Sequence, residues 1–115
     1  MEIDILCPMC SCIQETTSHL FLHCSKALQF WSGLLLSQHN TYLQLFTVDC
    51  VNEWFFCWPS KTGNMFTVKV WKYLPYAAVL TIWKHRNGKI FKDRPVMIHK
   101  MQLETKGLVW FWGGN

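Results

Sequence analysis

The N-terminal quarter of the chain places cysteine and histidine at a spacing that can bind a metal ion. Cys7 and Cys10 form a C-x2-C pair, which predicts a tight turn with both thiols facing one point. His19 and Cys24 follow in an H-x4-C spacing at the start of a helical pattern. Zinc prefers cysteine and histidine ligands, and four protein ligands leave it no open position. The spacing therefore predicts a structural Zn2+ site at Cys7, Cys10, His19 and Cys24.

Two neighbouring residues compete for the same ion. His23 lies four residues after His19, on the same helical face, and Cys12 could replace Cys10. Residues five apart on an ideal helix point about 140° apart, so His19 and Cys24 can share an ion only near a helix start or in a distorted helix. The residues alone leave this choice open, beside the alternative of reduced, buried cysteines with a surface histidine.

The elements that must position these ligands are predicted to be helices. Apolar residues recur at three and four positions, the amphipathic helical period, and predict helices over about 16–36, 50–57, 65–92 and 96–112. Asp49 is expected to cap the second, with Cys50 and Cys57 buried, and 59–64 to form a loop. Pro75 is expected to divide the third helix in two. The fold class is mostly α, a small helical domain stabilised by zinc.

Length and charge describe one domain with two unlike parts. A chain of 115 residues is one domain at most. Residues 1–58 hold the cysteine and histidine segment with the helices after it, and carry one basic against five acidic residues. Residues 59–115 carry ten basic against two acidic residues. Such asymmetry indicates either a surface for a polyanion or a solvated basic face.

The basic residues concentrate towards the end of the third helix and beyond it. Six fall within seventeen positions that contain a single acid: Lys84, Arg86, Lys89, Lys92, Arg94 and Lys100. They are expected to contact phosphates of single-stranded RNA or DNA weakly and without reading sequence. The apolar face of Val79, Trp83 and Ile90 is expected to be buried. Arg86 is expected to stay solvated, and Asn87 to bond within the fold instead of reading bases.

Several other functions are not expected. The seven carboxylates are scattered, so we expect neither the two-metal chemistry of a polymerase or nuclease nor any other enzyme activity. The most apolar stretches run about eight residues, well short of the ~18 that a membrane-spanning helix needs. The N-terminus lacks the pattern of a secretory signal, so an intracellular location is expected, nucleus or cytoplasm unresolved.

Two separated motifs resemble a known family. The pattern C-x2-C-x4-E-T-x2-H-L-x3-C is carried by Cys7, Cys10, Glu15-Thr16, His19-Leu20 and Cys24. Downstream, I-W-x2-R-N-x3-F is carried by Ile82, Trp83, Arg86, Asn87 and Phe91, with further tryptophans at Trp31, Trp110 and Trp112. Together these are similar to the zinc-binding domain of plant non-LTR (LINE-type) retrotransposon reverse transcriptases, which also occurs in ribonuclease H-like plant proteins.

The resemblance implies a ligand set and a truncation. It implies Cys7, Cys10, His19 and Cys24 as the zinc ligands and gives His23 and Cys12 no role. In the family a helical region precedes the first cysteine, so the resemblance implies an N-terminally truncated piece. Aromatic surface left uncovered would favour self-association. The implied function is an accessory module that binds zinc and nucleic acid; the alternative is a structural or protein-interaction module in which zinc only stabilises the fold.

Overall fold

The structure is a computed structural model that describes residues 6–113. Helices dominate it, which confirms the predicted mostly α class; within the described residues the single β-bridge joins Leu6 and Gln14. The helical segments, in chain order, are η1 (His19–His23, a π-helix), α1 (Ser25–Leu34), α2 (His39–Gln44), α3 (Val51–Cys57), α4 (Met65–Lys92) and α5 (Ile98–Gly113).

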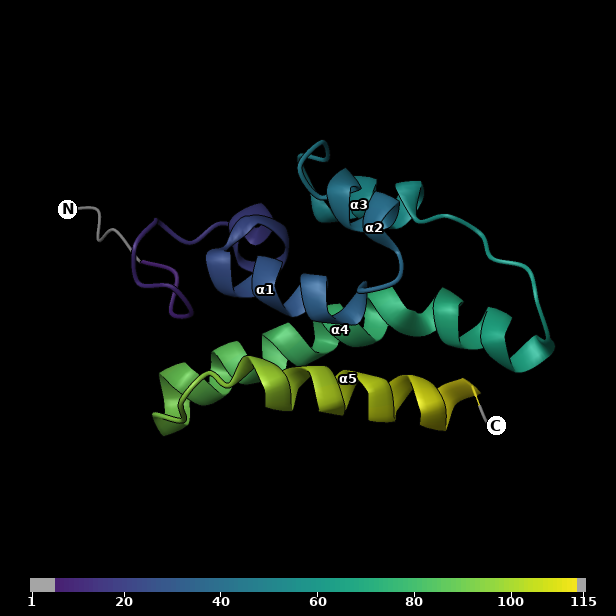
Figure 1. Ribbon diagram of the computed structural model, residues 1–115. Helices are drawn as coiled ribbons and strands as arrows, with labels where there is room; N and C mark the ends of the chain where they lie inside the picture. The colour runs from purple at the N-terminus through teal and green to yellow at the C-terminus, as the bar shows by residue number, and fades with distance from the viewer. Residues whose placement is uncertain (1–5, 114–115) are drawn as a thin grey trace.

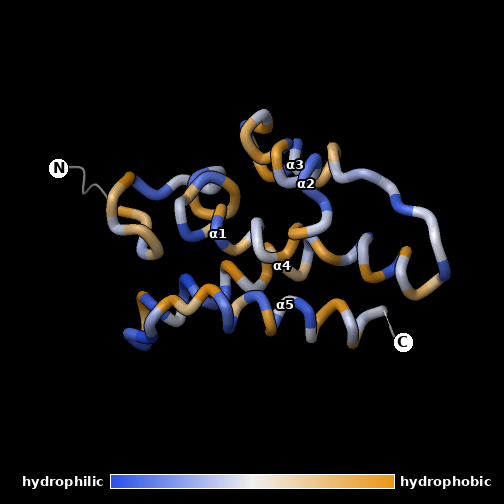
Figure 2. The backbone as a smooth tube through the Cα atoms, in the orientation of Figure 1, coloured by the Kyte–Doolittle hydropathy of each residue, from blue (hydrophilic) through white to orange (hydrophobic). Residues whose placement is uncertain are grey.

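The long helices α4 and α5 form an antiparallel hairpin that supports the rest of the chain (Figure 1). α1 packs against α5, and η1 packs against α4. The core between these layers is rich in large side chains; those fully buried include Leu22, Phe30, Trp31, Trp54, Ile82 and Met101. Hydrophilic residues gather at the turn between α4 and α5, whereas hydrophobic and hydrophilic residues alternate along α5 (Figure 2). No helix within residues 6–113 combines the length and apolarity needed to cross a membrane.

The prediction that Pro75 divides the third helix is wrong, because α4 runs unbroken from Met65 to Lys92. Proline has no N–H, so the carbonyl of Trp71 loses the donor it would have one turn later. The indole N–H of Trp58 donates to that carbonyl at 3.0 Å instead. A side chain from outside the helix therefore replaces the missing hydrogen bond, and the buried proline is tolerated.

The prediction of the buried face of α4 is also wrong. Trp83 is 46% exposed and Ile90 44% exposed, whereas Ala77, Ala78 and Thr81 are buried. These small residues let α5 approach closely, and the hydroxyls of Thr81 and Thr105 lie 3.0 Å apart across the two helices. The core face of α4 therefore combines these small residues with the buried Trp71, Leu74 and Ile82. Val79 is half-buried at its margin, and Trp83 and Ile90 lie outside it.

The other helix boundaries differ from expectation in smaller ways. The segment predicted as one helix over 16–36 is divided at Cys24, whose extended backbone separates η1 from α1. The short helix α2 was not predicted. Cys50, not Asp49, precedes α3, and Cys50 and Cys57 are half-buried and exposed, so the prediction that both are buried is wrong. The loop at 59–64 and the start of α4 after it are as predicted: Asn64 Oδ1 accepts from the Thr67 N–H at 2.8 Å.

Candidate metal centre

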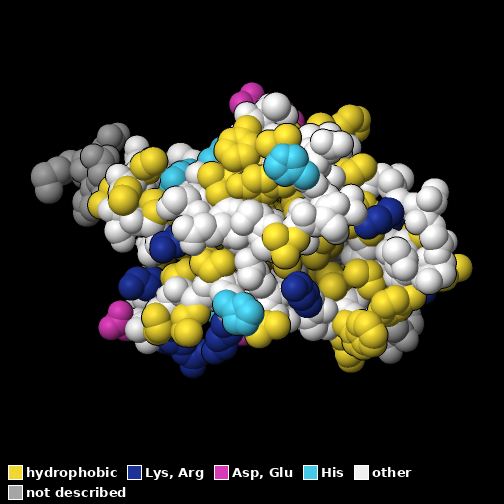
Figure 3. All heavy atoms as spheres, viewed as in Figure 1, with side chains coloured by type: hydrophobic (Ala, Val, Ile, Leu, Met, Phe, Trp, Pro, Cys, Tyr) yellow, Lys and Arg dark blue, Asp and Glu magenta, His cyan; other side chains and the backbone are white. Residues whose placement is uncertain are grey.

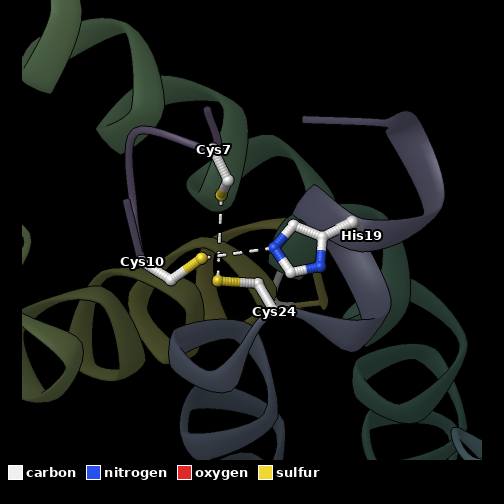
Figure 4. Close-up of side chains that lie close together, drawn as sticks. All are labelled: Cys7, Cys10, His19 and Cys24. Atoms are coloured by element: carbon white, nitrogen blue, oxygen red, sulfur yellow. Dashed lines mark hydrogen bonds between the residues drawn. The ribbon is translucent and has the colours of Figure 1, made fainter. Parts of the chain in front are cut away.

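The four ligands predicted from spacing converge on one point. Sγ of Cys7, Cys10 and Cys24 and a ring nitrogen of His19 all lie within 4.8 Å of one another. The Cys7 and Cys24 sulfurs are 3.8 Å apart, and Cys10 Sγ is 3.3 Å from His19 Nε2. Figure 4 shows the four side chains pointing toward a common centre. Tetrahedral zinc with Zn–S bonds of about 2.3 Å places its sulfurs about 3.8 Å apart, so the sulfur spacing fits.

A tight loop presents the first two cysteines. The Cys7 N–H donates to the Ile13 carbonyl and the Ser11 N–H to the Cys7 carbonyl, both at 2.8 Å. Ser11 adopts φ 57°, in the left-handed region, which lets the chain reverse immediately after Cys10. The loop therefore closes on itself and directs both thiols inward.

A π-turn presents the other two ligands. The Cys24 N–H donates to the His19 carbonyl at 2.6 Å, five residues back along η1. Such a turn is wider than an α-turn by one residue, so it brings residues five apart closer to one face. This is the local distortion that the H-x4-C spacing requires, and it explains how His19 and Cys24 reach the same point.

The thiols of the cluster differ in acidity. Burial raises the pKa of Cys10, but hydrogen bonds from the Cys12 backbone, His19 and the Ile13 backbone outweigh it and bring the pKa down to about 6. Burial raises the pKa of Cys24 to about 12, despite hydrogen bonds from the backbones of Ala27 and Lys26. Metals bind thiolates, so a cation entering at neutral pH must displace the proton of Cys24.

The two competing residues point elsewhere. Cys12 is exposed, and its thiol donates to the Cys10 carbonyl at 3.1 Å. His23 Nε2 donates to the carbonyl of Leu45 at 3.0 Å, on the α2 side of the domain. Neither belongs to the cluster of four, which can therefore hold a metal ion with two cysteines from the loop and a histidine and cysteine from the π-turn.

An ion pair fastens the cysteine loop to α4. Arg86 donates from Nη2 to Glu15 Oε1 at 2.6 Å and from Nε to Oε2 at 3.0 Å. Each side chain is only 17% exposed, and the hydrogen bond to Glu15 raises the pKa of Arg86. The guanidinium also lies 4.9 Å from the Trp83 ring centroid and donates to Asn87 Oδ1 at 3.0 Å. The expectation that Arg86 is solvated is thus wrong, because its guanidinium N–H groups are directed at Glu15. The expectation that Asn87 bonds within the fold is confirmed.

Three of the other predicted basic residues line one hollow. Lys84 of α4, Arg94 of the turn and Lys100 of α5 surround a space of about 400 Å³, which we call the basic hollow. Its one carboxylate, Glu104, is 2.7 Å from His85 Nε2 and 3.8 Å from Lys84 Nζ. Lys89 and Lys92 do not line it. Figure 3 shows Lys and Arg side chains gathered over this end of the hairpin, at the lower left.

Comparison with known protein families, curated proteins and solved structures finds no match to this chain.

Proposed function

We propose that this protein is a zinc-stabilised, non-catalytic module that binds single-stranded RNA or DNA, derived from a retrotransposon reverse transcriptase. The observation that carries the proposal is the convergence of Cys7, Cys10, His19 and Cys24 on one point. Three thiols and an imidazole are soft and borderline ligands that favour zinc over magnesium or calcium. Because all four positions are filled by protein, the ion serves to hold the fold and not to activate a substrate.

The basic hollow supports the nucleic-acid part of the proposal. Lys84, Arg94 and Lys100 come from α4, the turn after it and α5, and they share one concave surface at the end of the hairpin. Glu104 neutralises one of these charges, so the hollow keeps a net positive charge of about two. Converging cations of this kind bind phosphates of a nucleic-acid backbone without reading its sequence.

The contact between Glu15 and Arg86 supports the proposed origin. These residues belong to the two separate motifs that resemble the reverse transcriptase zinc-binding domain, and they are 71 positions apart in the chain. Their pairing explains why the two motifs occur together: the first motif carries the candidate metal ligands, and Arg86 of the second holds the metal-binding loop against α4.

The test compares two variants of equal net charge in binding to a fluorescent single-stranded oligonucleotide. One carries Lys84→Gln, Arg94→Gln and Lys100→Gln; its matched control carries Lys26→Gln, Lys69→Gln and Lys106→Gln, away from the hollow. The plot of log affinity against log salt has a negative slope of about 0.7 per phosphate contact for a single strand, so loss of three contacts in the first variant should make this slope less negative by about 2. Equal losses of affinity in both variants would mean that only net charge matters and would overturn the proposal.

The second candidate, a protein-interaction module, rests on a partly exposed apolar face of α4. Tyr76, Leu80, Trp83 and Ile90 recur at helical spacing on this face and are each roughly half exposed. An apolar stripe of this kind is typical of a surface that packs against another helix or a second copy of the chain. Concentration-dependent association in sedimentation, with no polynucleotide binding at low salt, would favour this candidate.

A further inference from the structure

A second hollow, the aromatic cleft, lies between α3, the 58–64 loop and the first half of α4, the region drawn in teal and green in Figure 1. Its volume is about 280 Å³, near the lower end of pockets that hold small molecules. It shares no residue with the metal cluster or the basic hollow. The side chains that matter here are Phe55, Trp58, Lys61, Trp71, Lys72 and Tyr76.

Tyr76 is the ring that the cleft offers to a ligand. It stacks on Phe55, with ring centroids 4.8 Å apart and an interplanar angle of 21°, yet remains 54% exposed. Trp71, by contrast, is buried: Trp58 packs against it with centroids 4.6 Å apart, and Lys61 Nζ lies 4.6 Å from its ring centroid. A planar group can therefore stack on Tyr76, which Phe55 holds in place from behind.

The charge of the cleft selects against cationic ligands. Aromatic clusters often bind quaternary ammonium groups through their ring faces. Here Lys61 already lies over Trp71, Lys72 is exposed at the wall, and no carboxylate is among the lining residues. A second cation would be repelled, so the cleft fits a ligand that joins a planar apolar group to an anion.

The hydrogen bonds of the cleft disfavour a proline-rich peptide. Aromatic grooves also bind such peptides, and an indole N–H could donate to their carbonyls. Both indole N–H groups are occupied here: Trp58 donates to the Trp71 carbonyl at 3.0 Å, and Trp71 to the Pro59 carbonyl at 2.6 Å. The cleft therefore presents an aromatic ring surface and ammonium groups to a ligand, and this combination binds a base and its phosphate.

We infer that the aromatic cleft binds one nucleotide of a single strand, with the base stacked on Tyr76 and the phosphate paired with Lys61 or Lys72. This inference rests on the proposed function and adds a second contact point to it, separate from the basic hollow. Stacking on an aromatic side chain tolerates any base, so the site adds affinity without sequence preference.

The experiment follows the indole N–H signals of the zinc-loaded protein by NMR during titration with adenosine monophosphate, ribose 5-phosphate and a short oligoadenylate. Adenosine monophosphate and the oligonucleotide should shift the signals of Trp58 and Trp71. Ribose 5-phosphate, which lacks the base, should bind at least about 10-fold more weakly, because stacking contributes about 1–3 kcal/mol per base.

Two pairs of variants locate the effect. Tyr76→Ala should lower the affinity for adenosine monophosphate about 10-fold. Phe56→Ala, which removes a 91% exposed ring just outside the cleft, should leave this affinity unchanged. Lys72→Gln should weaken binding, whereas Lys69→Gln, one turn earlier and outside the cleft, should not.

The outcomes separate this inference from the proposed function. If the oligonucleotide binds through the basic hollow while the Trp58 and Trp71 signals stay fixed, the inference fails and the proposed function stands. If adenosine monophosphate shifts the signals but the oligonucleotide does not, the cleft takes free nucleotides only and the inference for a strand is overturned. Equal binding of ribose 5-phosphate, or a proline-rich peptide shifting the same signals, also overturns it. If no oligonucleotide binds anywhere at low salt, both proposals fail.

Discussion

The ion pair between Glu15 and Arg86 gives the most direct test of how the metal-binding loop is held. Substituting Arg86→Ala removes two hydrogen bonds to Glu15, of 2.6 and 3.0 Å, and the guanidinium that covers the Trp83 ring. It leaves the Glu15 carboxylate, 17% exposed, without this partner. Exposed ion pairs contribute about 0–1 kcal/mol, whereas breaking a buried pair costs about 3–5 kcal/mol. With slight exposure at both partners, we expect a loss of about 2–3 kcal/mol.

The assay is urea denaturation of the zinc-loaded protein, followed by tryptophan fluorescence. Arg94→Ala is the matched control, because Arg94 is exposed and has no ion pair among the residues the structure describes; it should change stability by less than about 0.5 kcal/mol. A double-mutant cycle with Glu15→Gln should show a coupling of at least about 1 kcal/mol. If Arg86→Ala is no worse than Arg94→Ala, or the two substitutions simply add, the pair does not hold the loop and the reasoning is refuted.

Three further predictions concern the metal, the pH and catalysis. Metal analysis of the purified protein should show that Cys24→Ala loses stoichiometric zinc, while Cys12→Ala and His23→Ala retain it. A chelator should unfold at least residues 5–35. Retention of zinc by Cys24→Ala would reject the ligand set. Burial raises the pKa of Glu104, but the hydrogen bond and charge of His85 and the charges of Lys84 and Lys100 lower it overall. A carboxyl whose pKa is lowered by folding adds stability above its ordinary pKa of about 4.3, and this stability is lost as the pH falls further. When the pH is lowered below about 4.5, Glu104→Gln should therefore lose less stability than the parent in denaturation experiments, and parallel losses would contradict this. The protein should not cleave an RNA–DNA hybrid with Mg2+ present, and cleavage abolished by mutating one of its seven carboxylates would overturn the non-catalytic assignment.

The sequence determined the features that depend on neighbours along the chain. The helical period predicted the class of the fold, and the loop residues at 59–64 predicted the start of α4, because amphipathic spacing and turn-forming residues act within a few positions. The spacing of Cys7, Cys10, His19 and Cys24 predicted a shared metal, with either a helix start or a distorted helix at the last two ligands. These ligands span eighteen residues, and the loop after Cys7 and the π-turn at Cys24 direct them toward one point through hydrogen bonds between near neighbours in the chain.

Only the tertiary structure decided the features that depend on contacts far apart in sequence. Pro75 stays inside α4 because Trp58, from the other side of a loop, supplies the missing donor to Trp71. Arg86 is removed from the solvent by Glu15, 71 positions away, and Lys84, Arg94 and Lys100 meet because α5 folds back on α4. The buried face of α4 was decided by how closely α5 approaches its small residues, and helical periodicity carries no information on which of two adjacent apolar faces a distant helix will cover.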